Sequence, residues 1–415
     1  MSVTRRQILQ GMGVMPLFNF NLAGFCNMPM AKDRALIVLW LDGGLTHLDT
    51  FDCKPEAPVD IRGDIKSKKT SVDGVFFAEQ LPRLGKLMKK LTLFRSITHG
   101  EGVHDRASQY LLTGHRPSPV LSHPFLGAVH ALGAKDSNMP ALVAIPDAPT
   151  HGKQGFLAAD KGPFEVGGEP GRPGFAVRNL KPRVSTKRTG LLRKIDALDG
   201  KPRSDSEKAR DSFLDQARAL SLDAEARAVF NLDKEKQQVR QRYGRHKMGQ
   251  SCLLARRLVE NGTKTVLIRD IGWDHHRDVK RALTYGFPGK YVLLDQSISA
   301  LVDDLERREL SDKVLLVVAS EFGRTPRLNP AGGRDHWPRS QVVLTFGAGM
   351  KRGVAIGSTD RRGEAPAEGA MSPADFHATI VAALGNDLEQ SLHTADGRPI
   401  PVVERGGKPV REALR

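Results

Sequence analysis

The sequence predicts one large α/β domain in which a mostly parallel sheet is flanked by helices. Three observations predict it. Short apolar runs alternate with segments of helical period. Three of those runs end in acids or histidines, as strands of an open α/β sheet do at a ligand site. The chain has 415 residues, of which 40% are hydrophobic, which is enough for a substantial core.

The predicted elements follow one another without a linker that would mark a second domain. Buried strands are expected in the apolar runs ALIVLWLDGG (35–44), LTLFRSIT (91–98), ALVAIP (141–146), KTVLIRD (264–270) and VLLVVAS (314–320). Helices are expected near 81–90, at 106–112 before Gly114, and at 291–310. Glycine and proline from 152 to 188 predict a long loop, and a charged helical insertion is expected at about 185–262.

Charged side chains leave three of these strands at the end where a parallel sheet binds its ligands. Asp42 lies at the end of the first strand, and Glu321 follows the strand of residues 314–320. The segment GWDHH, which follows the strand of residues 264–270, adds Asp274, His275 and His276. Any one acid here could simply cap a helix or form a turn. Taken together, acids and imidazoles at one sheet edge predict a divalent metal site.

The net charge and the amino-terminal segment limit the possible classes of function. The formal charge of +16 favours anionic partners, but no nucleic-acid-binding module accompanies the basic residues. Residues 1–30 form a twin-arginine export signal in this interpretation, with Arg5-Arg6 before an apolar stretch too short to span a bilayer stably. We therefore expect a periplasmic or secreted protein, no stable membrane span after export and no nucleic-acid partner. The oligomeric state stays open.

Several motifs together resemble a known family. They are WLDGGLTHLDTFDCKP, YLLTGHRP, YGRHKMGQSCLLARRLVENG, GWDHH, SEFGRTPRLN and GGRDHWP, and they cover nearly the whole of residues 31–415. The chain is identified as a member of the twin-arginine-exported proteins of domain-of-unknown-function family 1501. That family is similar to the alkaline phosphatase and sulfatase superfamily, which implies a doubly wound, alkaline-phosphatase-like sheet with metal ligands at strand ends.

The resemblance also implies a ligand set. Asp42 matches the superfamily's first acid, and Ser320 to Gly323 match its later Ser-Asp-His-Gly strand end. Glu321 can replace the aspartate there, but Phe322 cannot replace the imidazole. Asp274 and His276 match the ligands of the other metal, with His275 in reserve. His336 resembles the late histidine. The predicted metal ligands are thus Asp42, Asp274, His276, Glu321 and His336, around zinc, manganese or calcium.

His104 stands where sulfatases have their nucleophile, counted back from Leu111-Leu112-Thr113-Gly114. It could attack the substrate itself, bind the metal and leave a metal-bound hydroxide to attack, or be the remnant of a lost activity. Ser108, one helical turn later, is an alternative nucleophile.

Arg324 follows Glu321 at the same edge and is suited to gripping phosphate or sulfate oxygens, although it could instead orient Glu321 or Asp335. The sequence thus predicts a metal-dependent hydrolase of phosphate or sulfate esters, whose substrate is an anionic small molecule or polysaccharide. The alternative is a non-catalytic envelope or polysaccharide-binding protein on a degenerate sulfatase-like scaffold.

Overall fold

A central eight-stranded sheet organises the chain in the computed structural model, which describes residues 33–135, 137–177, 180, 220–285 and 289–415. The strand order is β12-β4-β11-β8-β1-β7-β5-β6. The strands are β12 (Val354–Ile356), β4 (Thr92–Ile97), β11 (Gln341–Gly347), β8 (Val314–Ala319), β1 (Ala35–Asp42), β7 (Thr265–Ile271), β5 (Leu142–Ile145) and β6 (Phe164–Glu165). Only β11 runs against its neighbours among these strands. The predicted mostly parallel α/β sheet is confirmed.

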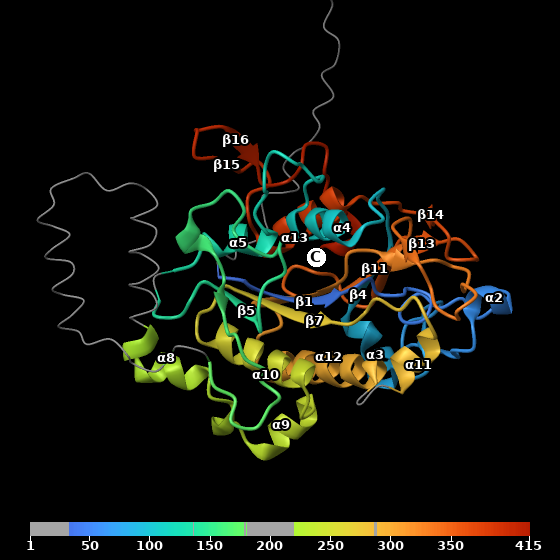
Figure 1. The fold of residues 1–415 in the computed structure, drawn as a ribbon, viewed down its shortest axis with the longest axis horizontal. Coiled ribbons are helices and arrows are strands. Elements are labelled where there is room, and N and C mark those ends of the chain that lie inside the picture. Colours follow the sequence, from blue (N-terminus) through green and yellow to red (C-terminus); the bar gives the residue numbers. More distant parts are fainter. Residues whose placement is uncertain (1–32, 136, 178–179, 181–219, 286–288) are drawn as a thin grey trace, which may run out of the picture. The chain divides into compact units, whose positions relative to one another are not determined.

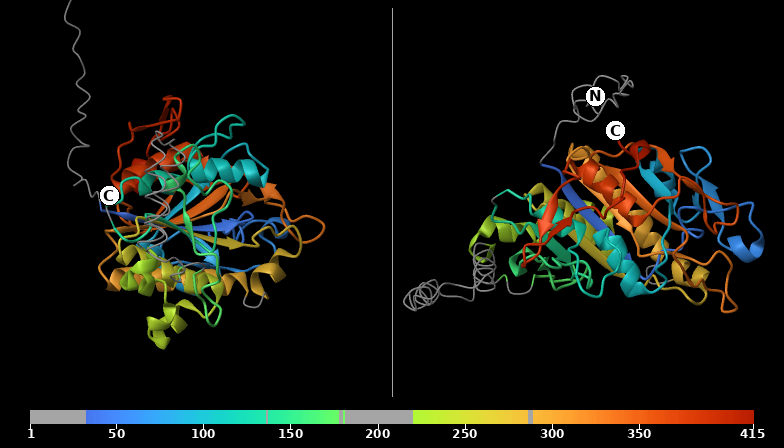
Figure 2. Two further views of the ribbon diagram at one scale, coloured as in Figure 1. Left: turned by 60° about the vertical axis from the view of Figure 1, so that its left-hand side comes forward. Right: turned by 90° about the horizontal axis from the view of Figure 1, so that it is seen from above.

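Helices cover both faces of this sheet (Figure 1). One face carries α3 (Pro82–Leu87), α10 (Lys247–Glu260) and α12 (Lys290–Arg307). The other carries α4 (His104–Thr113), α5 (Leu126–Ala131) and α13 (Pro373–Leu384). Alternate residues of β1 serve the two layers, since Leu39 and Leu41 enter one apolar cluster and Val38 and Trp40 the other. Figure 2 shows the same layers from two further sides.

The remaining described elements are short. The helices and 3-10 turns are α2 (Val59–Arg62), η2 (Met88–Lys90), η3 (Ala159–Lys161), α8 (Ala224–Val229), η4 (Leu232–Lys234), α9 (Gln237–Tyr243), α11 (Val279–Thr284) and η5 (Arg411–Ala413). The hairpin strands are β2 (Ser67–Lys69) with β3 (Phe76–Ala78), β9 (Gly323–Arg324) with β10 (His336–Trp337), β13 (Ser358–Thr359) with β14 (Pro366–Glu368), and β15 (Ser391–His393) with β16 (Pro399–Pro401).

The predicted strands and helices fall close to their expected places. The helix expected at 106–112 is α4, which begins two residues earlier and ends at the left-handed Gly114. Most of the region from 178 to 219 lies outside the described residues, as does the predicted export signal, so the domain boundaries stay predictions. Among the described residues, no helix has both the length and the apolar character needed to cross a bilayer.

The sheet topology sets the position of the site. The central strand β1 pairs in parallel with β8 on one side and β7 on the other. Asp42 therefore ends its strand at the same edge where Glu321 follows β8 and Asp274 follows β7. The backbone joins these exits further: the Gly43 N–H donates to Glu321 Oε1 (2.9 Å), and the Trp273 N–H donates to the Asp42 carbonyl (3.2 Å).

Candidate metal centre

Three imidazoles and one carboxylate meet above this sheet edge. His104 Nε2 lies 3.4 Å from one oxygen of Asp274, and His276 Nε2 lies 2.9 Å from the other. His336 Nε2 lies 3.0 Å from His276 Nε2 and 3.5 Å from Asp274. The ligand atoms of His104, Asp274 and His336 all lie within 4.8 Å of one another. Donor atoms around a tetrahedral zinc with bonds of 2.0–2.1 Å are about 3.3 Å apart, so these spacings suit a single cation.

The Nδ1 atom of each imidazole has an oxygen as its hydrogen-bond partner. The Nδ1 atoms of His104, His276 and His336 lie 2.7 Å from Glu321 Oε1, 2.7 Å from Asp335 Oδ1 and 2.9 Å from the Gly102 carbonyl, respectively. Since a carboxylate or carbonyl oxygen can only accept, each Nδ1 carries the hydrogen. A ring that carries its only hydrogen on Nδ1 turns an Nε2 lone pair toward Asp274. Lone pairs and a carboxylate cannot face each other at these distances unless a proton or a metal cation lies among them.

Hydrogen bonds, burial and neighbouring charges shift the pKa values of these side chains. The hydrogen bond to Glu321 raises the pKa of His104 above its usual value, against the opposing effect of burial. Burial lowers the pKa of His336. Burial would raise the pKa of Asp274, but the hydrogen bond and charge of Arg324 together with the charges of His276 and His104 outweigh it, so the pKa of this carboxyl is below its usual value. The hydrogen bond with His276 likewise lowers the pKa of Asp335.

Glu321 is fully buried and lies behind His104. Its Oε1 accepts from the Gly43 N–H and from His104, and its Oε2 lies 2.9 Å from the Ser320 hydroxyl. Metal-bound histidines are typically oriented by a carboxylate in this way. The geometry thus favours a positioning role for Glu321 over the predicted role as a direct ligand.

Asp42 ends β1 as predicted, but its carboxylate has a partner within the protein. Its carboxylate accepts from Arg269 Nε (2.7 Å), while Arg269 Nη1 donates to Asp147 (2.9 Å). The structure therefore pairs Asp42 with a guanidinium and does not bring it into the cluster. Phe322, which is fully buried, packs its ring 5.0 Å from that of His104 and 4.6 Å from that of His336. An apolar ring and an arginine thus stand where the resemblance implies a second cation.

Arg324 is buried, and the protein uses all its donors. Nε donates to the Gly44 carbonyl (3.0 Å), and Nη1 donates to the Arg334 carbonyl (3.0 Å) and lies 3.5 Å from His276 Nε2. Nη2 donates to Asp274 (2.5 Å) and to the Gly43 carbonyl. A substrate oxygen would have to replace one of these acceptors, so the predicted grip on substrate stays a prediction. In this structure Arg324 holds Asp274.

Of the two histidines in GWDHH, the structure brings the preferred one into the cluster. His275 is the reserve, and burial lowers its pKa to about 4. Its ring lies 6.2 Å from that of Trp273. Ser108, the alternative nucleophile, lies buried one turn along α4.

Sequence reasoning missed the groups that brace the site. Arg334 and Asp49 are both buried and form a bidentate pair (2.6 and 3.0 Å), which anchors the segment that carries Asp335 and His336. The place of Arg334 immediately before the Asp-His pair was the available signal.

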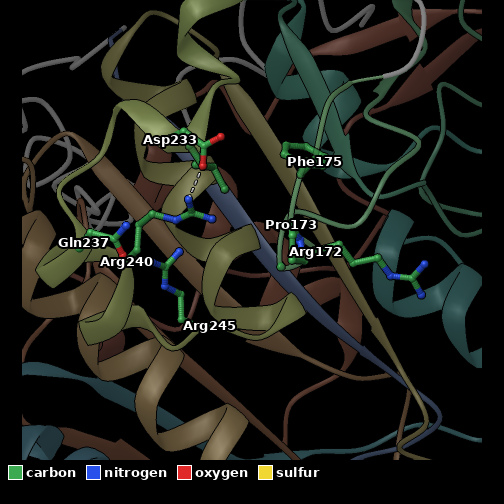
Figure 3. A pocket seen from close by; sticks show the side chains of 10 residues that line it. Arg172, Pro173, Phe175, Asp233, Gln237, Arg240 and Arg245 are labelled. Atoms are coloured by element: carbon green, nitrogen blue, oxygen red, sulfur yellow. Dashed lines mark hydrogen bonds and ion pairs between the residues drawn. The ribbon is translucent and has the colours of Figure 1, made fainter.

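A separate cavity of about 520 Å³ lies beside α9 and η4 (Figure 3). Its arginines have protein partners: Arg240 donates to Asp233 (2.5 Å) and Arg245 to Gln237. None of the residues that line it is a histidine or a cysteine, so it is not the predicted metal centre.

Comparison with known proteins places the chain by its sequence. The model of the family described as "Protein of unknown function (DUF1501)" matches residues 33–414. The chain belongs to this family. No curated protein matches the sequence.

Similar solved structures belong to hydrolases and a synthase, at low identity. A sulfatase from Pseudoalteromonas sp. is 12% identical with a TM-score of 0.36, over 85% of this chain and 68% of that one. The phosphonate monoester hydrolase of Agrobacterium radiobacter is 13% identical with a TM-score of 0.34, over 92% and 77%. The lipoteichoic acid synthase LtaP from Listeria monocytogenes is 12% identical with a TM-score of 0.36, over 86% and 73%.

Proposed function

We propose that this DUF1501 protein is a metal-dependent hydrolase of phosphate or sulfate esters. One observation carries the proposal: three imidazoles, each fixed through Nδ1, turn their Nε2 atoms toward the carboxylate of Asp274. The proposed ligands are Asp274, His276, His336 and His104. Three nitrogen donors favour zinc over calcium or manganese, which prefer oxygen.

A divalent cation at this centre would neutralise the oxygens of an anionic ester and lower the pKa of water at the site. Residues of the chain orient the proposed ligands and add positive charge. Glu321 and Asp335 fix the rings of His104 and His276, and Arg324 holds Asp274 while adding positive charge next to the reacting group. Because Nε2 of His104 is assigned to the cation, water is the attacking group in this proposal, and a covalent histidine is not needed.

Metal analysis of the purified protein tests the centre. We expect about one zinc-like cation per chain, and its loss in the double variant Asp274→Ala, His276→Ala. The matched control is His393→Ala, Asp396→Ala on the exposed β15–β16 hairpin, which should keep the metal. A panel of aryl phosphates and sulfates then tests turnover. A wild-type protein that holds no metal and hydrolyses no ester would overturn the proposal.

The second candidate is a non-catalytic binding protein for envelope or polysaccharide ligands. Phe322 favours it, since its apolar ring packs against His104 and His336 where the resemblance implies a further imidazole. Stoichiometric metal in a protein that turns over no ester would support this candidate.

We also propose export through the twin-arginine pathway. The predicted signal, Arg5-Arg6 and the apolar stretch behind it, lies outside the described residues. Export should fail in the double variant Arg5→Lys, Arg6→Lys, as measured by cell fractionation. Undiminished export would refute the assignment.

A further inference from the structure

A second histidine–carboxylate pair lies one residue along α4 from the proposed ligand His104. His151 Nε2 lies 2.9 Å from Asp105 Oδ1. The His151 side chain is 15% exposed and that of Asp105 is 69% exposed. Asp105 follows the proposed ligand His104 in the first turn of α4, whereas His151 comes from the loop after β5. The pair thus connects the start of α4 to a loop that is distant in sequence.

The backbone around His151 is fixed. The Gly152 N–H donates to the Pro149 carbonyl (2.8 Å), and the Phe125 N–H donates to the Lys153 carbonyl (2.9 Å). A Cβ at Gly152 would lie 2.8 Å from the side chain of Leu267, so this turn packs closely on the sheet. Through Asp105, His151 contacts the first turn of α4, the helix that begins with the proposed ligand His104. A ring held in this way can keep one orientation through a reaction.

We propose that His151 is the general acid that protonates the leaving alcohol, an inference that rests on the proposed hydrolase function. Asp105 accepts the Nε2 proton, which leaves Nδ1 to donate. Asp105 is then a positioning residue that fixes which nitrogen faces the substrate. A hydrolase of alkyl or sugar esters needs such a group because an alkoxide is a poor leaving group.

The step balances as a hydrolysis. Water forms a bond to the phosphorus or sulfur, and the bond from that atom to the ester oxygen breaks. The electron pair stays on the ester oxygen, which takes the Nδ1 proton from the His151 imidazolium and leaves as the alcohol. The proton lost by the attacking water passes to solvent, and solvent returns one proton to His151. Only water is consumed besides the ester.

The test compares two leaving groups on the purified, metal-loaded protein. A 4-nitrophenyl ester departs as a stable phenolate, whereas a methyl ester departs as an alkoxide, which is a far stronger base and a poorer leaving group. We expect His151→Gln to lower kcat/KM for the methyl ester by about 10²–10⁴-fold and to change the 4-nitrophenyl ester far less. Asp105→Asn should show the same dependence on the leaving group with a smaller loss.

His393→Gln, at an exposed position on β15, is the matched control and should leave both rates unchanged. Equal losses on both esters, or no loss on either, would overturn the role of His151 while leaving the hydrolase proposal intact. A wild-type protein that cleaves neither ester would instead overturn the proposed function, and this inference with it. The melting temperature and metal content of His151→Gln are measured in parallel and should match those of the wild type.

Discussion

Replacing Glu321 by glutamine tests whether this carboxylate orients His104 or binds the cation itself. Glutamine has nearly the same shape, so the change removes the charge and alters the hydrogen bonding at one site. Its amide oxygen can still accept from the Gly43 N–H. His104 then faces a neutral acceptor, and the amide NH₂ faces a Ser320 hydroxyl that already lies 3.0 Å from two backbone donors. We expect a correctly folded protein with a loosened imidazole.

The size of the effect follows from these contacts. Loss of a carboxylate that orients a metal-bound histidine typically costs about 10–100-fold in metal affinity, which corresponds to about 1.4–2.8 kcal/mol. A crowded buried donor costs about 1–3 kcal/mol of folding stability. The affinity is measured by competition with a chromogenic chelator, and the stability by denaturant unfolding of the metal-free protein.

Two outcomes would refute the reasoning. An unchanged metal affinity would mean that Glu321 does not position His104. Complete loss of binding in a folded protein, equal to that of Asp274→Asn, would make Glu321 a direct ligand, as the sequence alone predicts. Ser372→Ala is the control, since it weakens a remote helix cap without contact with the centre.

Three further predictions concern the scaffold. Arg334→Ala should lower the free energy of unfolding by about 3–5 kcal/mol because Asp49 is left buried without its partner; a denaturant midpoint equal to that of the wild type would contradict this. Burial lowers the pKa of both His130 and His377 to about 4. The unfolded chain therefore binds more protons between pH 6.5 and 4, so stability should fall with decreasing pH in this window by an order of 3 kcal/mol for each histidine. His377→Gln should flatten that pH dependence in urea melts, and an identical profile would refute the assignment. Ser372→Ala should lower the free energy of unfolding by about 1 kcal/mol, because it removes the capping box of α13. An unchanged melting temperature would contradict this prediction.

The parts of the fold that depend on chain-local patterns could be predicted from the sequence. The apolar runs that became β1, β7 and β8 are long and buried, and a parallel sheet places all their carboxyl ends at one edge. Asp274 and Glu321 therefore had to emerge near one another. The left-handed Gly114 similarly fixed the end of α4.

Which side chain touches which could not be predicted, because it depends on pairings between distant segments. Asp42 ends its strand as expected, but the partner of its carboxylate is Arg269 on the neighbouring strand. Position in the sequence does not distinguish an acid that binds a cation from one that meets a guanidinium. His104 and Glu321 lie 217 positions apart, and only their contact gives each its part in the centre.

The same contacts bear on how many cations the site can hold. A second cation would need acids with free oxygens, but Asp42 is paired with Arg269 and Glu321 accepts hydrogen bonds from protein groups. Phe322 adds a buried apolar ring where a further imidazole would be required. Arg269 is shared between Asp42 and Asp147, so Asp42 already has a cationic partner within the protein. If the proposed centre holds one cation, a protein acid is the group left to protonate the leaving oxygen. The pair of His151 and Asp105, which begins one residue after His104, matters to the proposed chemistry for this reason.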